Sequence, residues 1–145
     1  MRDKPRAARA IDEFLLALGY RIEGELVGTG QRVAEAWAEE LVSAEGRDPT
    51  EPLRAGSLAL GPGSRSAVVL RDLAVATMCP HHLLPSHGRA TVIYQPRDRA
   101  AGLGAIAQAV DLCARRLTLQ ETLTQNVADA LLRGLEAEGS LCQLS

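Results

Sequence analysis

Aromatic side chains are scarce in this sequence. They make up 3% of its 145 residues, with one Trp, one Phe and two Tyr. Stacking platforms for single-stranded nucleic acid need several aromatic rings. In addition, a net charge of −2 with a pI near 5.9 supplies no basic field for a phosphate backbone. We therefore expect no nucleic-acid partner, and a core built mainly from Leu, Val and Ala.

Long apolar runs and paired cysteines are also missing. No window approaches the ~18 to 20 uninterrupted apolar residues of a membrane helix, and the charged N-terminus leads into no signal-peptide core. The three cysteines are an odd number, which does not make a disulfide framework. We expect a cytoplasmic protein with no membrane partner, whose free thiols bind metal, react or pack.

What the sequence does contain is the balance of a soluble globular protein, with 46% apolar and 23% charged residues. Residues 1–10 are charged and rich in Ala, and we interpret them as a flexible arm. A single domain is expected over 11–145. Its N-terminal part, 11–43, has the apolar spacing of two helices. Residues 43–64 hold many Pro and Gly and are interpreted as a connector with room for one short strand.

The core of the predicted domain covers residues 66–145. Its first segment is rich in Val, Leu and Ala, its second reads Gly-Arg-Ala-Thr-Val-Ile-Tyr, and the two predict strands that pair as a hairpin. The expected elements, in order, are strands over 67–78 and 88–94, helices over 103–117 and from 118, and a strand from 140. This order of helices and strands predicts an α+β fold.

The loop between the two predicted strands carries Cys79 and His82. Their spacing lets a thiolate and an imidazole turn toward one ion, and Pro80 stiffens the turn. These ligand types favour Zn²⁺ over Ca²⁺ or Mg²⁺, which prefer oxygen. The alternative is a buried structural cysteine beside surface histidines. We predict a zinc site.

A catalytic zinc ion usually takes three protein ligands and a water molecule, so a third ligand is expected. The candidates are Cys142, on the last predicted strand, Cys113 and His87. Cys113 falls on the apolar stripe of its helix, where a small buried thiol is the commoner explanation. We therefore predict Cys142 as the third ligand.

Three further residues are candidates for acting on a substrate. His81 adjoins the predicted metal ligands without being needed as one, which suits a general acid or base; the alternative is a solvated loop histidine. Glu121 and Gln120 have two explanations of equal weight. Thr118 and Glu121 have the form of a capping box. A carboxylate at a helix start could equally accept the N–H groups of a guanine-type ring.

Four motifs follow one another along the chain: Met78-Cys79-Pro80-His81-His82-Leu83-Leu84-Pro85 with Gly88, then Tyr94-Gln95-Pro96, Gly102-Leu103, and Leu119-Gln120-Glu121-Thr122-Leu123-Thr124-Gln125. In these motifs, over about residues 11 to 145, the chain resembles the GTP cyclohydrolase I family. A Cys-x-His-His-Leu-x-Pro run followed by Gln-Glu-x-Leu-Thr is specific, whereas either piece alone would be weak.

The resemblance implies a tunnelling-fold subunit, an antiparallel sheet with helices packed on one face, after an N-terminal helical pair. It implies a homo-oligomeric ring, such as a decamer, with active sites between subunits. Cys79 and His82 correspond to zinc ligands, His81 to the acid-base residue, and Gln120 with Glu121 to the pair that holds the purine ring. The implied reaction opens the imidazole ring of GTP with a zinc-activated water, releases formate and yields dihydroneopterin triphosphate, in folate and pterin biosynthesis.

The sequence departs from the family pattern in two places. Where the family has a Lys and an Arg that grip the triphosphate, this chain has Ala105 and Gln108. Losing two charge-assisted partners should cost on the order of 1.5 to 3 kcal/mol each. The family's third zinc ligand lies in a His-x-Cys segment beyond the position of Ser145, so Cys142 would be a substitution. The alternative function is therefore a divergent or non-catalytic relative that binds a purine or pterin.

Overall fold

The structure is a computed structural model that describes residues 2–61, 63 and 66–145. Met1 and connector residues 62 and 64 therefore lie outside the described part. The chain divides into two compact units, Met1–Ser43 and Ala44–Ser145. The expected single domain over 11–145 thus separates at Ser43, because the N-terminal helices pack mainly on each other.

The first unit is the predicted pair of helices with short helical additions. Its elements are α1 (Lys4–Ala17), the 3₁₀ turn η1 (Gly24–Leu26), α2 (Thr29–Ala36) and a π-helical segment η2 (Trp37–Leu41). The expectation of a flexible arm over residues 1–10 is wrong from Lys4 onward. Asp3 caps α1 by accepting a 3.0 Å hydrogen bond from the Arg6 N–H, and Lys4 forms an ion pair with Glu39.

The second unit has the predicted α+β order with two additions. Its elements are α3 (Thr50–Ala55), β1 (Ser57–Ala59), β2 (Val68–Met78), β3 (Pro85–Gln95), β4 (Arg99–Ala101), α4 (Leu103–Ala114), α5 (Gln120–Leu135) and β5 (Gly139–Leu144). The predicted hairpin and closing strand are confirmed, since β2, β3 and β5 form an antiparallel sheet in the order β2-β3-β5. Sequence reasoning missed α3 and β4.

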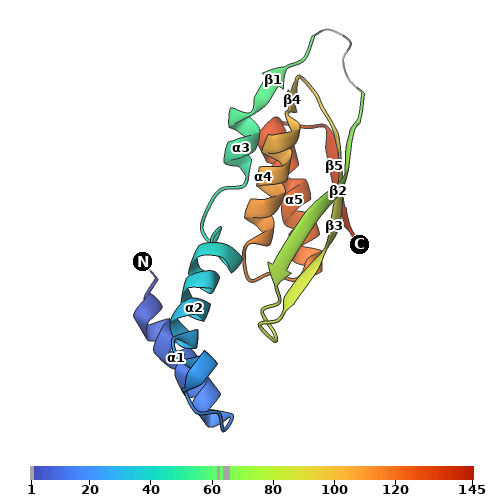
Figure 1. The fold of residues 1–145 in the computed structure, drawn as a ribbon. Coiled ribbons are helices and arrows are strands. Elements are labelled where there is room, and N and C mark those ends of the chain that lie inside the picture. The colour runs from blue at the N-terminus through green and yellow to red at the C-terminus, as the bar shows by residue number, and fades with distance from the viewer. Residues whose placement is uncertain (1, 62, 64–65) are drawn as a thin grey trace. The chain divides into compact units, whose positions relative to one another are not determined.

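Helices α4 and α5 cover one face of this sheet (Figure 1), as the fold class predicts. Side chains alternate along the strands, so every second residue of β3 from Ala90 to Tyr94 is buried against the helices. On β2 a bulge inserts an extra residue between Leu70 and Leu73, and Asp72 takes a left-handed φ of 60° there. The bulge keeps Leu73 and Val75 directed into the core.

The other face of the sheet is not covered within the described second unit. Val69, Ile93 and Leu141 are register partners across the three strands and form an apolar row on this face. Val69 is 46% exposed and Leu141 is 51% exposed.

No helix of the described residues is long and apolar enough to cross a membrane.

Candidate functional site

The loop that carries the predicted metal ligands is the turn of the β2–β3 hairpin. It runs from Cys79 to Leu84 and is closed by two backbone hydrogen bonds. The Cys79 N–H donates to the Leu84 carbonyl over 3.0 Å, and the Leu83 N–H donates to the Cys79 carbonyl over 2.9 Å. Leu83 has a left-handed φ of 55°, which costs a non-glycine residue about 1 kcal/mol or more. The loop is therefore a defined turn that holds Cys79 at its base.

The two adjacent histidines lie on the exposed part of this turn. Their rings contact edge to face, with centroids 6.2 Å apart at an angle of 84°. Cys79 is partly buried, while His81 and His82 are exposed to solvent. A thiol and two imidazoles are thus displayed at one end of the sheet and are accessible to an ion and a small molecule.

The start of α5 is fixed beside the end of β2, which brings Gln120 and Glu121 to the same end of the fold. The Thr118 N–H donates to the Met78 carbonyl over 3.1 Å. The Thr77 hydroxyl donates to the Arg116 carbonyl over 3.3 Å. Segments some forty residues apart in sequence therefore meet where the Cys79 turn begins.

The structure tests the capping-box explanation of Glu121. In a capping box its carboxylate would accept the Thr118 N–H, but that N–H is bonded to Met78. The N-cap of α5 is Leu119, which makes no side-chain capping bond. The capping-box interpretation is therefore wrong. Among the described residues no donor contacts the exposed Glu121 carboxylate, so it can accept N–H groups from a ligand.

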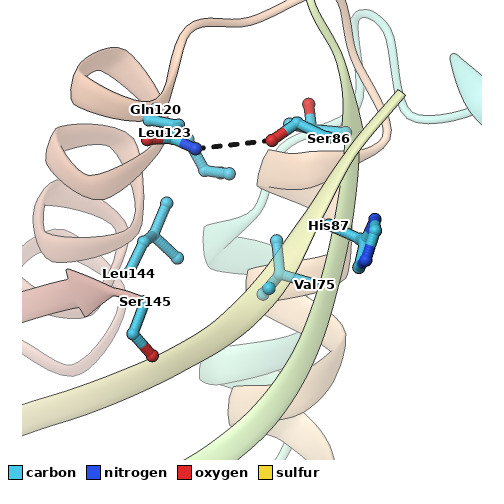
Figure 2. A pocket seen from close by; sticks show the side chains of 9 residues that line it. Val75, Ser86, His87, Gln120, Leu123, Leu144 and Ser145 are labelled. Carbon is cyan, nitrogen blue, oxygen red and sulfur yellow. Dashed lines mark hydrogen bonds between the residues drawn. The ribbon is translucent and has the colours of Figure 1, made fainter. Parts of the chain in front are cut away.

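A small hollow of about 80 Å³ lies beside Gln120, between α5 and the β2–β3 hairpin. Figure 2 shows Gln120 reaching across it to Ser86, and its Nε2 donates to the Ser86 hydroxyl over 3.3 Å. Gly88 forms the floor, where a Cβ atom would come within 2.4 Å of the Ser145 carbonyl oxygen. Sequence analysis did not identify Ser86 as a site residue. It could have been found because Ser86 lies two residues before Gly88 on one strand, which puts both residues on the face of the sheet that the helices cover.

The structure does not bring the predicted third ligand, Cys142, to the hairpin turn. Cys142 pairs with Val92, and Val92 is seven residues from Pro85, where the turn ends. At ~3.3 Å per residue the separation is ~23 Å, whereas two ligands of one zinc ion lie within ~4 Å of each other. Cys142 instead packs against the hydrophobic core.

The other two candidates for a third ligand are also placed elsewhere. Cys113 is fully buried on α4, as its position on the apolar stripe indicates. His87 follows Ser86 on β3, so its side chain lies on the uncovered face of the sheet (Figure 2). In the described part of the chain no three His, Cys, Asp or Glu side chains are grouped to hold a metal ion. Cys79 and His82 therefore stay the predicted pair of ligands, with no third one grouped beside them in the described residues.

The three thiols should differ in reactivity. Burial raises the pKa of Cys113 to about 11 and the pKa of Cys142 to about 11, so few thiolates form there at pH 8. We expect a water-soluble thiol reagent to modify Cys79 first and the other two only after unfolding, as mass spectrometry of labelled peptides would report. Labelling of Cys142 at the rate of Cys79 would contradict this placement. Added Zn²⁺ should slow the labelling of Cys79 alone.

The two positions that depart from the family pattern lie on α4. Ala105 is partly buried against Gly56, where an added Cβ on the glycine would come within 2.6 Å of the Ala105 Cβ. Gln108 is exposed on the same helix. Ala105 has no polar side-chain atom, and Gln108 has no charge. Neither supplies a cation to a phosphate group.

Comparison with known protein families gives one match across nearly the whole chain. Residues 7–145 match the model of the family described as GTP cyclohydrolase I. The match includes the hairpin turn, the start of α5 and the N-terminal helices, so it covers every residue of the candidate site.

Individual relatives share about two fifths of their residues with this chain. The GTP cyclohydrolase 1 of Chromobacterium violaceum is 42% identical over 135 residues, which are 92% of this chain and 64% of the relative. That of Ralstonia nicotianae is 39% identical over 97% of this chain and 66% of the relative. That of Streptococcus pyogenes serotype M1 is 37% identical over 96% of this chain and 71% of the relative. The chain thus spans about two thirds of the length of these relatives.

Proposed function

Because the chain belongs to the GTP cyclohydrolase I family, we propose that it is a zinc-dependent hydrolase that opens the imidazole ring of a guanine nucleotide. Formate leaves, the ribose is rearranged and its carbons close the second ring of the pterin, and the product is dihydroneopterin triphosphate, a precursor of pterins and folate. One observation carries the proposal. The segment before α5 is hydrogen-bonded to the end of β2, where the Cys79 turn begins, so the proposed metal-binding residues and the exposed Glu121 lie at the same end of a tunnelling-fold subunit.

Glu121 and Gln120 are the proposed purine-binding residues. A guanine ring presents N–H groups on its edge, and an exposed carboxylate accepts such groups through charge-assisted bonds. Glu121 is exposed at the first turn of α5, and Gln120 adds an amide that both donates and accepts. Together the two side chains can fix the orientation of the ring relative to the hairpin turn.

His81 is the proposed acid-base residue. An imidazole can accept and donate a proton at neutral pH, and ring opening requires protons to move on and off ring atoms. His81 is exposed and contacts the His82 ring edge to face. It therefore lies beside a predicted metal ligand without occupying a ligand position.

Cys79 and His82 are the proposed zinc ligands of this chain. The thiol at the base of the turn and the imidazole three residues later match the ligand types of zinc. When bound, the ion would supply Lewis-acid activation of water near neutral pH. The described residues group no third His, Cys, Asp or Glu with this pair. A reducing compartment, the cytoplasm, is the proposed setting because all three cysteines are free thiols.

A homo-oligomeric ring, such as a decamer, is the proposed assembly, with sites between subunits. One feature of the described residues supports it. The uncovered face of the sheet carries the apolar row of Val69, Ile93 and Leu141, and apolar rows of this kind favour burial against another protein surface.

The second candidate function is a divergent relative that binds a purine or pterin without turnover. The observation that favours it is the absence of cationic side chains at Ala105 and Gln108. Such a protein would keep the Glu121 acceptor and lose affinity for the triphosphate.

Formate release from GTP by the zinc-loaded chain tests the proposal. We expect Glu121→Gln to lower kcat/KM by about 10- to 100-fold, because a charge-assisted bond becomes a neutral one. Glu138→Gln is the control with the same change of charge at an exposed position between the end of α5 and β5, and it should match the wild type. Absence of formate from the wild type would contradict the proposal. Calorimetric binding of guanosine without formate release would favour the second candidate.

A further inference from the structure

Ser86 contacts Gln120, one of the two proposed purine-binding residues, from the opposite wall of the hollow. It is partly buried on β3, and its hydroxyl faces α5. The 3.3 Å bond from Gln120 Nε2 to this hydroxyl joins the hairpin to the first residue of α5. Within the described residues no other side chain hydrogen-bonds to Gln120, so Ser86 alone restricts its amide.

An unrestricted glutamine at this position would be a poor recognition group. Gln120 is exposed, and a long polar side chain loses rotamer freedom when it binds a ligand. A bond to Ser86 restricts the side chain before the ligand arrives. It also uses one of the two Nε2 hydrogens and leaves Oε1 as an acceptor for a ring N–H group.

From this geometry we propose that Ser86 is a positioning residue that holds the Gln120 amide for purine recognition. The inference rests on the proposed function of Gln120. It assigns to Ser86 no contact with the ring and no part in the chemical step. Ser86 therefore affects how tightly the purine binds, and the rate of turnover at saturation should not depend on it.

The backbone at the start of α5 is held independently of Ser86. The Thr118 N–H bond to Met78 and the Thr77 hydroxyl bond to Arg116 fix the turn before the helix. Removing the Ser86 hydroxyl should therefore free the Gln120 side chain without moving Glu121 or the hairpin turn. This separation makes a positioning role distinguishable from a structural one.

Three variants of the full chain test the inference. Ser86→Ala should raise KM for GTP about three- to tenfold, the effect of losing one neutral hydrogen bond, with kcat within about twofold of the wild type. Ser86→Thr keeps a hydroxyl and should restore KM. Thr91→Val removes a hydroxyl from the opposite face of the same strand and should change neither constant. An unchanged KM in Ser86→Ala, an equal rise in Thr91→Val, or a loss confined to kcat would overturn the inference.

Guanosine binding, measured by calorimetry, separates failure of this inference from failure of the proposed function. If the wild type binds guanosine but releases no formate from GTP, the proposed reaction is wrong. The inference then stands only if Ser86→Ala weakens guanosine binding about three- to tenfold and Ser86→Thr does not. Equal affinities of wild type and Ser86→Ala, or no binding by the wild type, would overturn it.

Discussion

Replacing Cys79 by alanine should remove bound zinc and lower formate release by about a thousandfold or more. The thiol at the base of the hairpin turn is one of the two proposed zinc ligands, Cys79 and His82, and the described residues group no further His, Cys, Asp or Glu with them. A single imidazole does not hold Zn²⁺ at micromolar concentrations, and without Lewis-acid activation little hydroxide is available at neutral pH. Zinc content by elemental analysis and formate release would be measured on the same preparation.

The matched control for this prediction is Cys142→Ala. It removes the same side chain from a strand position ~23 Å along the sheet from the turn. We expect it to keep zinc and activity, with at most a small loss of stability, because Cys142 packs against the core. Loss of zinc in both variants would contradict the placement of Cys142 and return it to the ligand set. Full zinc content in Cys79→Ala would contradict the proposed site.

The hairpin and its functional turn could be predicted from sequence because their signals are local. A run rich in Val, Leu and Ala marks β2, apolar residues at every second position from Ala90 mark β3, and the Cys-Pro-His-His segment between them forms the connection. Likewise, apolar spacing marks α4 and α5. The position of Glu121 near the hairpin turn depends on contacts between segments that are far apart in the sequence. No local sequence pattern predicts such contacts.

Glu121 shows why local patterns mislead at this site. Thr118 and Glu121 have the spacing of a capping box, and that motif assumes that the Thr118 N–H has no other acceptor. In the folded chain the Met78 carbonyl, forty residues earlier, takes that N–H. The tertiary contact frees the carboxylate, so a residue with a plausible structural role becomes available for binding. Ser86 was missed for a related reason, because the side-chain hydrogen bond that it makes is to Gln120, a residue 34 positions later in the chain.

Helix α3 was missed because its first residues resemble a loop. Pro49 and Pro52 flank its start, and proline is tolerated in the first turn of a helix, where its missing N–H has no partner. The Asp48 carboxylate accepts bonds from the Thr50 N–H and hydroxyl, at 2.9 and 2.8 Å. The bond from the backbone N–H is the main reason that the pKa of Asp48 is lowered. Pro49 and Pro52 therefore mark the start of a helix and not a loop.

Replacing Leu53 by alanine should destabilise the second unit by ~2 to 5 kcal/mol. Leu53 is fully buried on α3 and fills the space above Gly134 of α5, where an added Cβ would lie 2.9 Å from the leucine. Its removal leaves a cavity that neighbouring backbone cannot close. Urea unfolding of the two proteins would give the difference in free energy.

Leu58→Ala is the control, because Leu58 is the same residue type five positions later and is 74% exposed on β1. We expect it to change the free energy of unfolding by less than ~0.5 kcal/mol. Equal effects of the two substitutions would mean that the segment around Leu53 behaves as the connector that its Pro and Gly content indicates. A large effect of Leu53→Ala alone would show that this segment is part of the core. Because α3 packs on α5, the helix that carries Gln120 and Glu121, a stable α3 would also help to hold the candidate site.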